Sequence, residues 1–99
     1  MTPPLKSLEE EFRLLTNSWK HNTAAQSMLE RIVRHPAYQQ IIALGPDVVP
    51  LILAELQRQP DHWFWALKSI TGEDPVPPGA NFTEAVEAWL AWGRKRGLI

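Results

Sequence analysis

The sequence predicts an all-α domain of about six helices. Apolar residues recur at intervals of three and four in successive segments, which is the periodicity of amphipathic helices. Capping residues or prolines stand where the segments begin, and no stretch alternates as a half-exposed strand would. With 99 residues, the chain suits a single domain over residues 1–99 that can bury a hydrophobic core. We expect N-terminal helices within residues 7–34 and further helices within residues 36–97.

The first two helices are predicted within residues 7–34. Ser7 and Glu10 have the spacing of a capping box, and one apolar face follows, formed by Leu8, Phe12, Leu15 and Trp19. Asn22 and Thr23 interrupt this pattern, and Thr23 can act as the N-cap of the second helix. The apolar face of the second helix consists of Ala25, Met28, Leu29, Ile32 and Val33.

Two prolines locate the next two helices. Pro36 suits the first position of the third helix, after His35 as its N-cap, because that position needs no N–H. In the fourth helix Pro50 is tolerated only within the first turn, so we expect the helix to begin at Asp47 or Val48. A wide apolar stripe predicts a central position for this helix. The stripe consists of Val48, Val49, Ile52, Leu53 and Leu56.

The fifth and sixth helices are separated by a proline-rich connector. Pro60 is expected at the first position of the fifth helix, with Asp61 complementing the helix dipole. Residues 75–79 contain three prolines and a glycine, which exclude a helix there. Asn81 and Glu84 have the spacing of an N-cap and its partner in a capping box. The inward face predicted for the sixth helix consists of Phe82, Val86, Trp89, Leu90 and Gly93.

Residues 36–96 show a recurrent order of elements. A short helix ends in Leu44-Gly45, the run PDVVPLIL opens a second helix, a third helix ends in Thr71-Gly72, and a longer helix follows. This order resembles HEAT-like helical repeats, in which an A helix ending near Leu-Gly pairs with a B helix that opens on a Val-Pro-Leu-Leu type of run. The resemblance implies antiparallel helical hairpins over residues 36–97, and a scaffold or adaptor that binds proteins along exposed helix faces.

Two shorter segments carry a second resemblance. The segments HPAYQQ and HWFWAL are similar to those of a small family of uncharacterised bacterial proteins. This resemblance implies a bacterial chain and no particular activity.

The composition narrows the classes of function. The chain contains no cysteine, which excludes disulfide scaffolds, thiol catalysis and cysteine-ligated zinc and suits a reducing compartment, so we expect a cytoplasmic protein. The net charge is −1, with one short basic cluster at Arg94, Lys95 and Arg96, and this balance argues against nucleic acid as a partner. No apolar run approaches the roughly 18 residues of a membrane span, so we expect no membrane partner.

The sequence shows no pattern typical of catalysis. His21, His35 and His62 lack another His, Asp or Glu at the spacing of a helical metal site. The chain also lacks a glycine-rich phosphate loop, a nucleophile elbow and a paired-carboxylate signature. We therefore expect no enzymatic activity, no cofactor and no metal.

Three consecutive aromatic residues, Trp63, Phe64 and Trp65, raise the main question. Neighbours on a helix are separated by about 100°, so three of them cannot share one face. Trp63 shares a face with Leu67 and Ile70 and is predicted to be in the core. Trp65 points the other way, which leaves two interpretations. Either it fills a second core layer, which we favour because tryptophan is rarely left in water, or it anchors a binding partner.

The same two interpretations apply to Trp92, which flanks the apolar face of the last helix. We take Tyr38, His62, Trp65 and Trp92 as candidate protein-binding residues. The function expected from the sequence is a small helical protein–protein interaction or adaptor module without catalytic activity, whose partner is another protein. The alternatives are an antitoxin-like or nucleic-acid-associated regulator, and an oligomerising structural protein that associates with itself.

Overall fold

The computed structural model describes residues 7–23 and 32–99, and within these residues it is helical without a strand. This confirms the all-α fold class. The elements are α1 (Leu8–Thr23), α3 (Pro36–Ala43), the 3₁₀ helix η1 (Pro46–Val48), α4 (Val49–Arg58), α5 (Phe64–Thr71) and α6 (Phe82–Lys95). The second predicted helix lies mostly outside the described residues, apart from Ile32 and Val33, which are helical.

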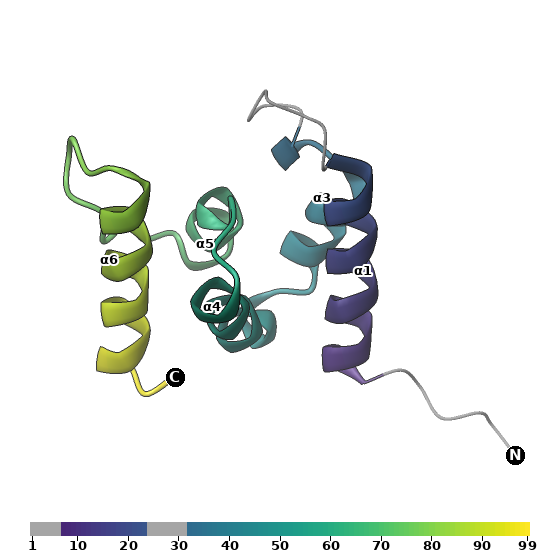
Figure 1. Ribbon diagram of the computed structural model, residues 1–99. Helices are drawn as coiled ribbons and strands as arrows, with labels where there is room; N and C mark the ends of the chain where they lie inside the picture. The colour runs from purple at the N-terminus through teal and green to yellow at the C-terminus, as the bar shows by residue number, and fades with distance from the viewer. Residues whose placement is uncertain (1–6, 24–31) are drawn as a thin grey trace, which may run out of the picture.

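The helices are arranged in layers around α4 and α5. Figure 1 shows α4 and α5 between α1 and α3 on one side and α6 on the other. Helix α1 packs against α3, α3 packs against α5, and α4 packs against α6. All five residues of the wide stripe of α4 are buried, which confirms its central position. The contact between α4 and α6 is close, because a Cβ at Gly93 would lie 2.7 Å from Leu53 Cδ1.

The chain turns through 104° between α3 and the segment of η1 and α4. These two neighbours in sequence therefore cross at a wide angle instead of reversing direction. None of the described helices is by itself long and apolar enough to cross a membrane, and this bent pair meets the length and composition criteria only when its two parts are taken together.

A cluster of aromatic rings joins α1 and α3 to the start of α5. The Trp63 ring lies 5.6 Å from Phe12, 4.7 Å from Trp19 and 6.0 Å from Tyr38, measured between ring centroids. All four rings are buried, and the Trp19 indole N–H donates to the Ile32 carbonyl at 2.8 Å. These rings come from α1, α3 and the residue before α5, so one cluster fixes three elements.

Two of the predicted N-caps are present, whereas η1, α4 and α5 begin without a side-chain cap. The predicted N-cap His35 is confirmed, because its Nδ1 accepts the Ala37 N–H at 3.0 Å. The capping box of Asn81 and Glu84 is also present in both directions. The fourth helix begins at Val49, slightly later than the expected start at Asp47 or Val48, because these two residues lie in η1. Pro50 is still in the first turn, as expected.

The prediction that the fifth helix begins at Pro60 is wrong, because α5 begins only at Phe64. The Asp61 carboxylate accepts the His62 N–H at 2.7 Å, and the Asp61 carbonyl accepts the Trp63 N–H at 2.8 Å. These bonds form a turn that competes with the first helical turn.

A second correction concerns Phe82, which was expected to point inward but is 41% exposed. It stands directly after the N-cap of α6. The rest of the predicted inward face, Val86, Trp89, Leu90 and Gly93, is buried.

An ion-pair network links α1 to α4. The Glu55 carboxylate accepts hydrogen bonds from Lys20 at 3.1 Å and from Arg58 at 2.7 Å, and Lys20 also donates to Gln59. Burial alone would raise the pKa of the Glu55 carboxyl, but the bonds from Arg58 and Lys20 outweigh it and hold the pKa below its usual value of 4.5. The network therefore stabilises the fold while this carboxylate is ionised.

We expect the stability of the protein to fall on acidification through Glu55. A carboxyl whose pKa is lower in the folded state stabilises the fold above its unfolded pKa and loses this contribution as the pH falls through the folded value. At neutral pH, Glu55→Gln should lower the free energy of unfolding by up to about 1 kcal/mol, because the group is partly screened by solvent. Urea unfolding of both proteins along a pH series should show this difference shrinking below the usual pKa of 4.5. A difference that grows on acidification would contradict this account.

Replacing Trp63 tests the aromatic cluster. Trp63→Ala removes a fully buried indole and should lower the free energy of unfolding by about 3–5 kcal/mol. Leu14→Ala is a suitable control, because Leu14 is 51% exposed and its replacement should have little effect. Equal urea midpoints for the two variants would show that the ring cluster does not hold the fold together.

Candidate functional site

The most exposed aromatic surface lies where α5 and α6 begin. Trp65 is 52% and Phe82 41% exposed, which are unusual values for large hydrophobic side chains. The Phe82 ring makes edge-to-face contacts with His62 at 5.6 Å and with Phe64 at 5.4 Å. We call His62, Phe64, Trp65 and Phe82 the aromatic patch.

A small cavity opens in this patch. Its volume is about 100 Å³, and it is lined by Val33, His62, Phe64 and Trp65. The walls are almost entirely apolar, so the cavity suits one apolar side chain better than a charged group.

The exposure of Trp65 decides between the two interpretations of this residue. The interpretation that Trp65 fills a second core layer is wrong, because more than half of its side chain is exposed. Trp63 occupies the inner position immediately before α5 and is fully buried. A residue two positions further along is rotated by about 200°, which directs Trp65 away from the core. Exposure permits the anchor interpretation, which stays a prediction.

Tyr38 was predicted to contact a partner, and the structure contradicts this because the residue is 0% exposed. Its hydroxyl instead donates to the His62 carbonyl at 2.9 Å and accepts the Ala66 N–H at 2.9 Å. Burial raises the pKa of the Tyr38 phenol, and the bond from Ala66 only partly opposes this, so the hydroxyl keeps its proton. Tyr38 therefore positions the segment that bears Trp65 without reaching the surface.

Trp92 lies apart from the aromatic patch. It is ten positions after Phe82 on α6, or about 15 Å along the helix axis. Its half-buried ring meets Trp89 edge to face at 5.2 Å, and the Arg96 guanidinium lies 4.6 Å from its centre. Arg96 also pairs with Glu73, so this member of the basic cluster has a structural role. Of the four predicted residues, only His62 and Trp65 lie together at the surface, where both line the small cavity.

Phe82 is a surface residue that helical periodicity had placed on the inward face of the sixth helix. Phe64 is half-buried and packs against the core. For Phe82, one available signal was its position directly after the N-cap, where a side chain lies at the end of the helix and is less completely covered by neighbours.

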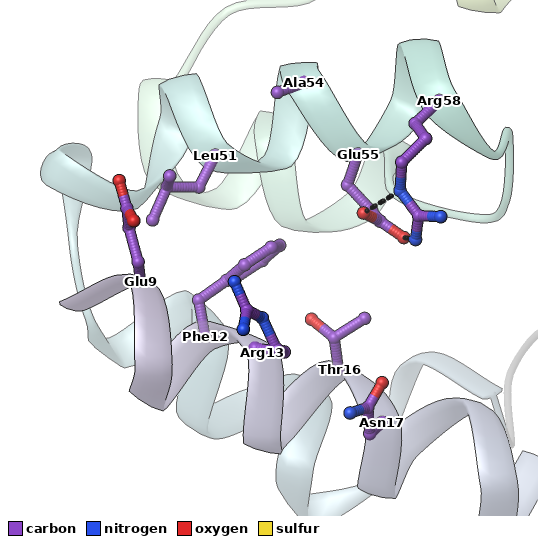
Figure 2. Close-up of a pocket in the computed structure, with 9 residues that line it drawn as sticks. All are labelled: Glu9, Phe12, Arg13, Thr16, Asn17, Leu51, Ala54, Glu55 and Arg58. Atoms are coloured by element: carbon purple, nitrogen blue, oxygen red, sulfur yellow. Dashed lines mark hydrogen bonds and ion pairs between the residues drawn. The ribbon is translucent and has the colours of Figure 1, made fainter. Parts of the chain in front are cut away.

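A larger groove lies between α1 and α4, and Figure 2 shows the residues that line it. Its volume is about 490 Å³. Phe12 and Thr16 line it from α1, and both are almost fully buried. On the α4 side Figure 2 shows Leu51 and Ala54, followed by the ion pair of Glu55 and Arg58.

Neither hollow shows a constellation typical of catalysis. The described residues contain no group of three or more His, Cys, Asp or Glu side chains that could hold a metal ion. The titratable side chain in the patch is a single histidine, His62.

Comparisons with known proteins return no match to a family model, to a curated protein or to a solved structure. The functional assignment therefore depends on the geometry and chemistry of the surfaces described above.

The role of the Tyr38 hydroxyl can be tested by removing this one group. Tyr38→Phe keeps the ring but leaves the Ala66 N–H and the His62 carbonyl without their partner, which should lower the free energy of unfolding by about 1–3 kcal/mol. Amide hydrogen exchange should also show faster exchange at Ala66, whereas Leu53 in the middle of α4 should change only with global stability. Unchanged exchange at Ala66 would show that the hydroxyl does not hold this segment.

Proposed function

We propose that this protein is a small helical protein-binding module without catalytic activity, and that the aromatic patch is its contact surface. The observation that carries the proposal is the exposure of Trp65, which is 52%. Tryptophan is among the residues that contribute most binding energy at protein interfaces. An indole left in water at the edge of an apolar cavity is suited to this role.

The support beneath the patch favours binding. Tyr38 fixes the backbone on both sides of Trp65 through His62 and Ala66, and Phe82 braces two of the rings. A surface that is held in its binding geometry before the partner arrives loses less conformational entropy on association.

The chemistry of the patch indicates the kind of partner. Its small cavity of about 100 Å³ accepts one aliphatic or aromatic side chain, and the exposed rings of Trp65 and Phe82 can cover the surroundings. We infer that the partner is a protein that presents an apolar residue at the centre of its contact surface, with polar residues around it.

The HEAT-like arrangement belongs to this proposal. Its support is the order of a short, a longer, a short and a longer helix, with 8, 10, 8 and 14 residues. The turn of 104° after α3 is more open than that of an antiparallel hairpin. The proposed adaptor role rests on the patch and does not depend on this arrangement.

Trp65→Ala tests the contact surface directly. The variant should keep nearly the urea midpoint of the wild type, because the residue is 52% exposed, but it should lose at least about 2 kcal/mol of binding free energy, or about 30-fold in affinity. Leu14→Ala is the matched control, because Leu14 is equally exposed but lies on α1.

The measurement is affinity capture from the native cell with wild type and both variants as bait, followed by titration of each retained protein. A partner held equally by wild type and Trp65→Ala would overturn the assignment of the patch. Sedimentation over a concentration series distinguishes self-association, in which the same variant should weaken the oligomer. A salt-resistant complex with DNA would instead favour the nucleic-acid alternative.

A further inference from the structure

The groove between α1 and α4 has two different walls. On α1, Glu9, Arg13 and Asn17 follow one another at intervals of four and therefore lie along one side of the helix. On α4 the wall begins with Leu51 and Ala54. The groove thus combines apolar surface with a row of hydrogen-bonding side chains, which is the usual composition of a site for a small ligand.

The indole N–H groups of Trp63, Trp89 and Trp92 and the Thr16 hydroxyl are buried without a hydrogen-bond partner in the described residues. Of these, Thr16 is the one that lines the groove. The residue is 5% exposed, and its hydroxyl has no hydrogen-bond partner in the described part of the protein. Figure 2 shows its side chain projecting from α1 into the space that faces Glu55 and Arg58. A buried hydroxyl without a partner destabilises a fold, and a ligand in the groove would supply the missing hydrogen bond.

The charges in the groove define the sign of the ligand. Glu55 is already bound by Lys20 and Arg58, so this carboxylate and the Arg58 guanidinium satisfy each other. Two lining charges, Glu9 and Arg13, have no ion pair among residues 7–23 and 32–99. Arg13 is three residues from Thr16 on α1 and Glu9 is seven residues from it, so the charged group of a ligand that reaches Thr16 lies nearer to Arg13. An unpaired guanidinium can donate two parallel hydrogen bonds to a carboxylate in a bidentate pair.

The shape of the groove limits the size of the ligand. Its volume of about 490 Å³ is within the range of roughly 300–1,000 Å³ for small-molecule sites. At one end, Lys20 bridges the two helices by bonds to Glu55 and Gln59. This bridge joins the two helices next to the lining residues Asn17 and Glu55, so a small molecule fits the groove better than a helix that would have to pass along both walls. The Phe12 ring in the groove offers an apolar surface against which another ring can pack.

We propose that the groove between α1 and α4 is a binding site for a small aromatic carboxylate. The carboxylate binds the Arg13 guanidinium, the ring packs between Phe12 and Leu51, and the Thr16 hydroxyl donates a hydrogen bond to the ligand. This site is separate from the aromatic patch and does not depend on the function proposed for that patch.

Phenylacetate is the probe that tests the site. Titration into the ¹⁵N- and methyl-labelled full chain should produce saturable shifts at Thr16, Leu51 and Ala54, with a dissociation constant on the order of 1 mM for a ligand of this size. Acetate lacks the ring and phenethylammonium carries the opposite charge, so both should bind at least about tenfold more weakly. Equal binding of phenethylammonium, or no saturable shift at these residues up to about 20 mM phenylacetate, would overturn the proposal.

Two variants connect the binding to the residues. Arg13→Gln should weaken phenylacetate about tenfold or more, whereas Arg94→Gln, which removes an equal charge at the far end of α6, should leave the affinity unchanged. If both variants weakened phenylacetate binding equally, the effect would come from the net charge of the protein and not from a contact with Arg13. That result would contradict the proposed site.

Thr16→Val separates binding from folding. Valine has nearly the shape of threonine and removes the unpartnered hydroxyl, so the urea midpoint of the free protein should stay the same or rise. The affinity for phenylacetate should fall about threefold to tenfold. A lower midpoint would show that the hydroxyl is used within the protein itself, and an unchanged affinity would show that no ligand uses it. Either result contradicts the proposal.

Discussion

The burial of Trp63 is the constraint on which the rest of the structure depends. Its indole lies among Phe12, Trp19 and Tyr38, so a single side chain ties α1 and α3 to the start of α5. Because Trp63 takes the inner position immediately before α5, the next residues must turn away from it. Phe64 reaches the ring of Phe82, and Trp65 reaches the surface. The run of three aromatic residues therefore serves both the core and an exposed surface.

The same cluster connects the small cavity of the aromatic patch with the groove between α1 and α4. Phe12 lies against Trp63 and also lines the groove between α1 and α4. On the other side, Tyr38 lies beside Trp63, and its hydroxyl holds the backbone on both sides of Trp65. Interior rings thus support a groove with both polar and apolar lining residues and an apolar patch, and a change in the core would affect both surfaces because close-packed interiors transmit strain.

The sequence predicted local features well where the deciding interaction is local. His35 and Asn81 cap their helices as expected, because the partner of an N-cap is two or three residues away. The start of α5 was predicted too early. An aspartate can stabilise either the first turn of a helix or a non-helical turn, and the Asp61 carboxylate accepts the His62 N–H in a turn. Burial was harder to predict because it depends on the neighbours of each helix. Tyr38 was mistaken for a surface residue, and for Trp65 the core layer was favoured over the exposed position that it takes. The groove depends on the angle between two helices distant in sequence.

The most direct test of this account is the solvent exposure of the five indole N–H groups. Each group gives its own signal in a ¹⁵N-labelled protein, and a soluble nitroxide broadens the signals of groups that solvent can reach. We predict that the Trp65 signal is broadened strongly while those of Trp19, Trp63 and Trp89, which are at most 1% exposed, are retained. A protected Trp65 signal, or a Trp63 signal broadened to the same degree, would contradict the claim that Trp63 occupies the core and directs Trp65 to the surface.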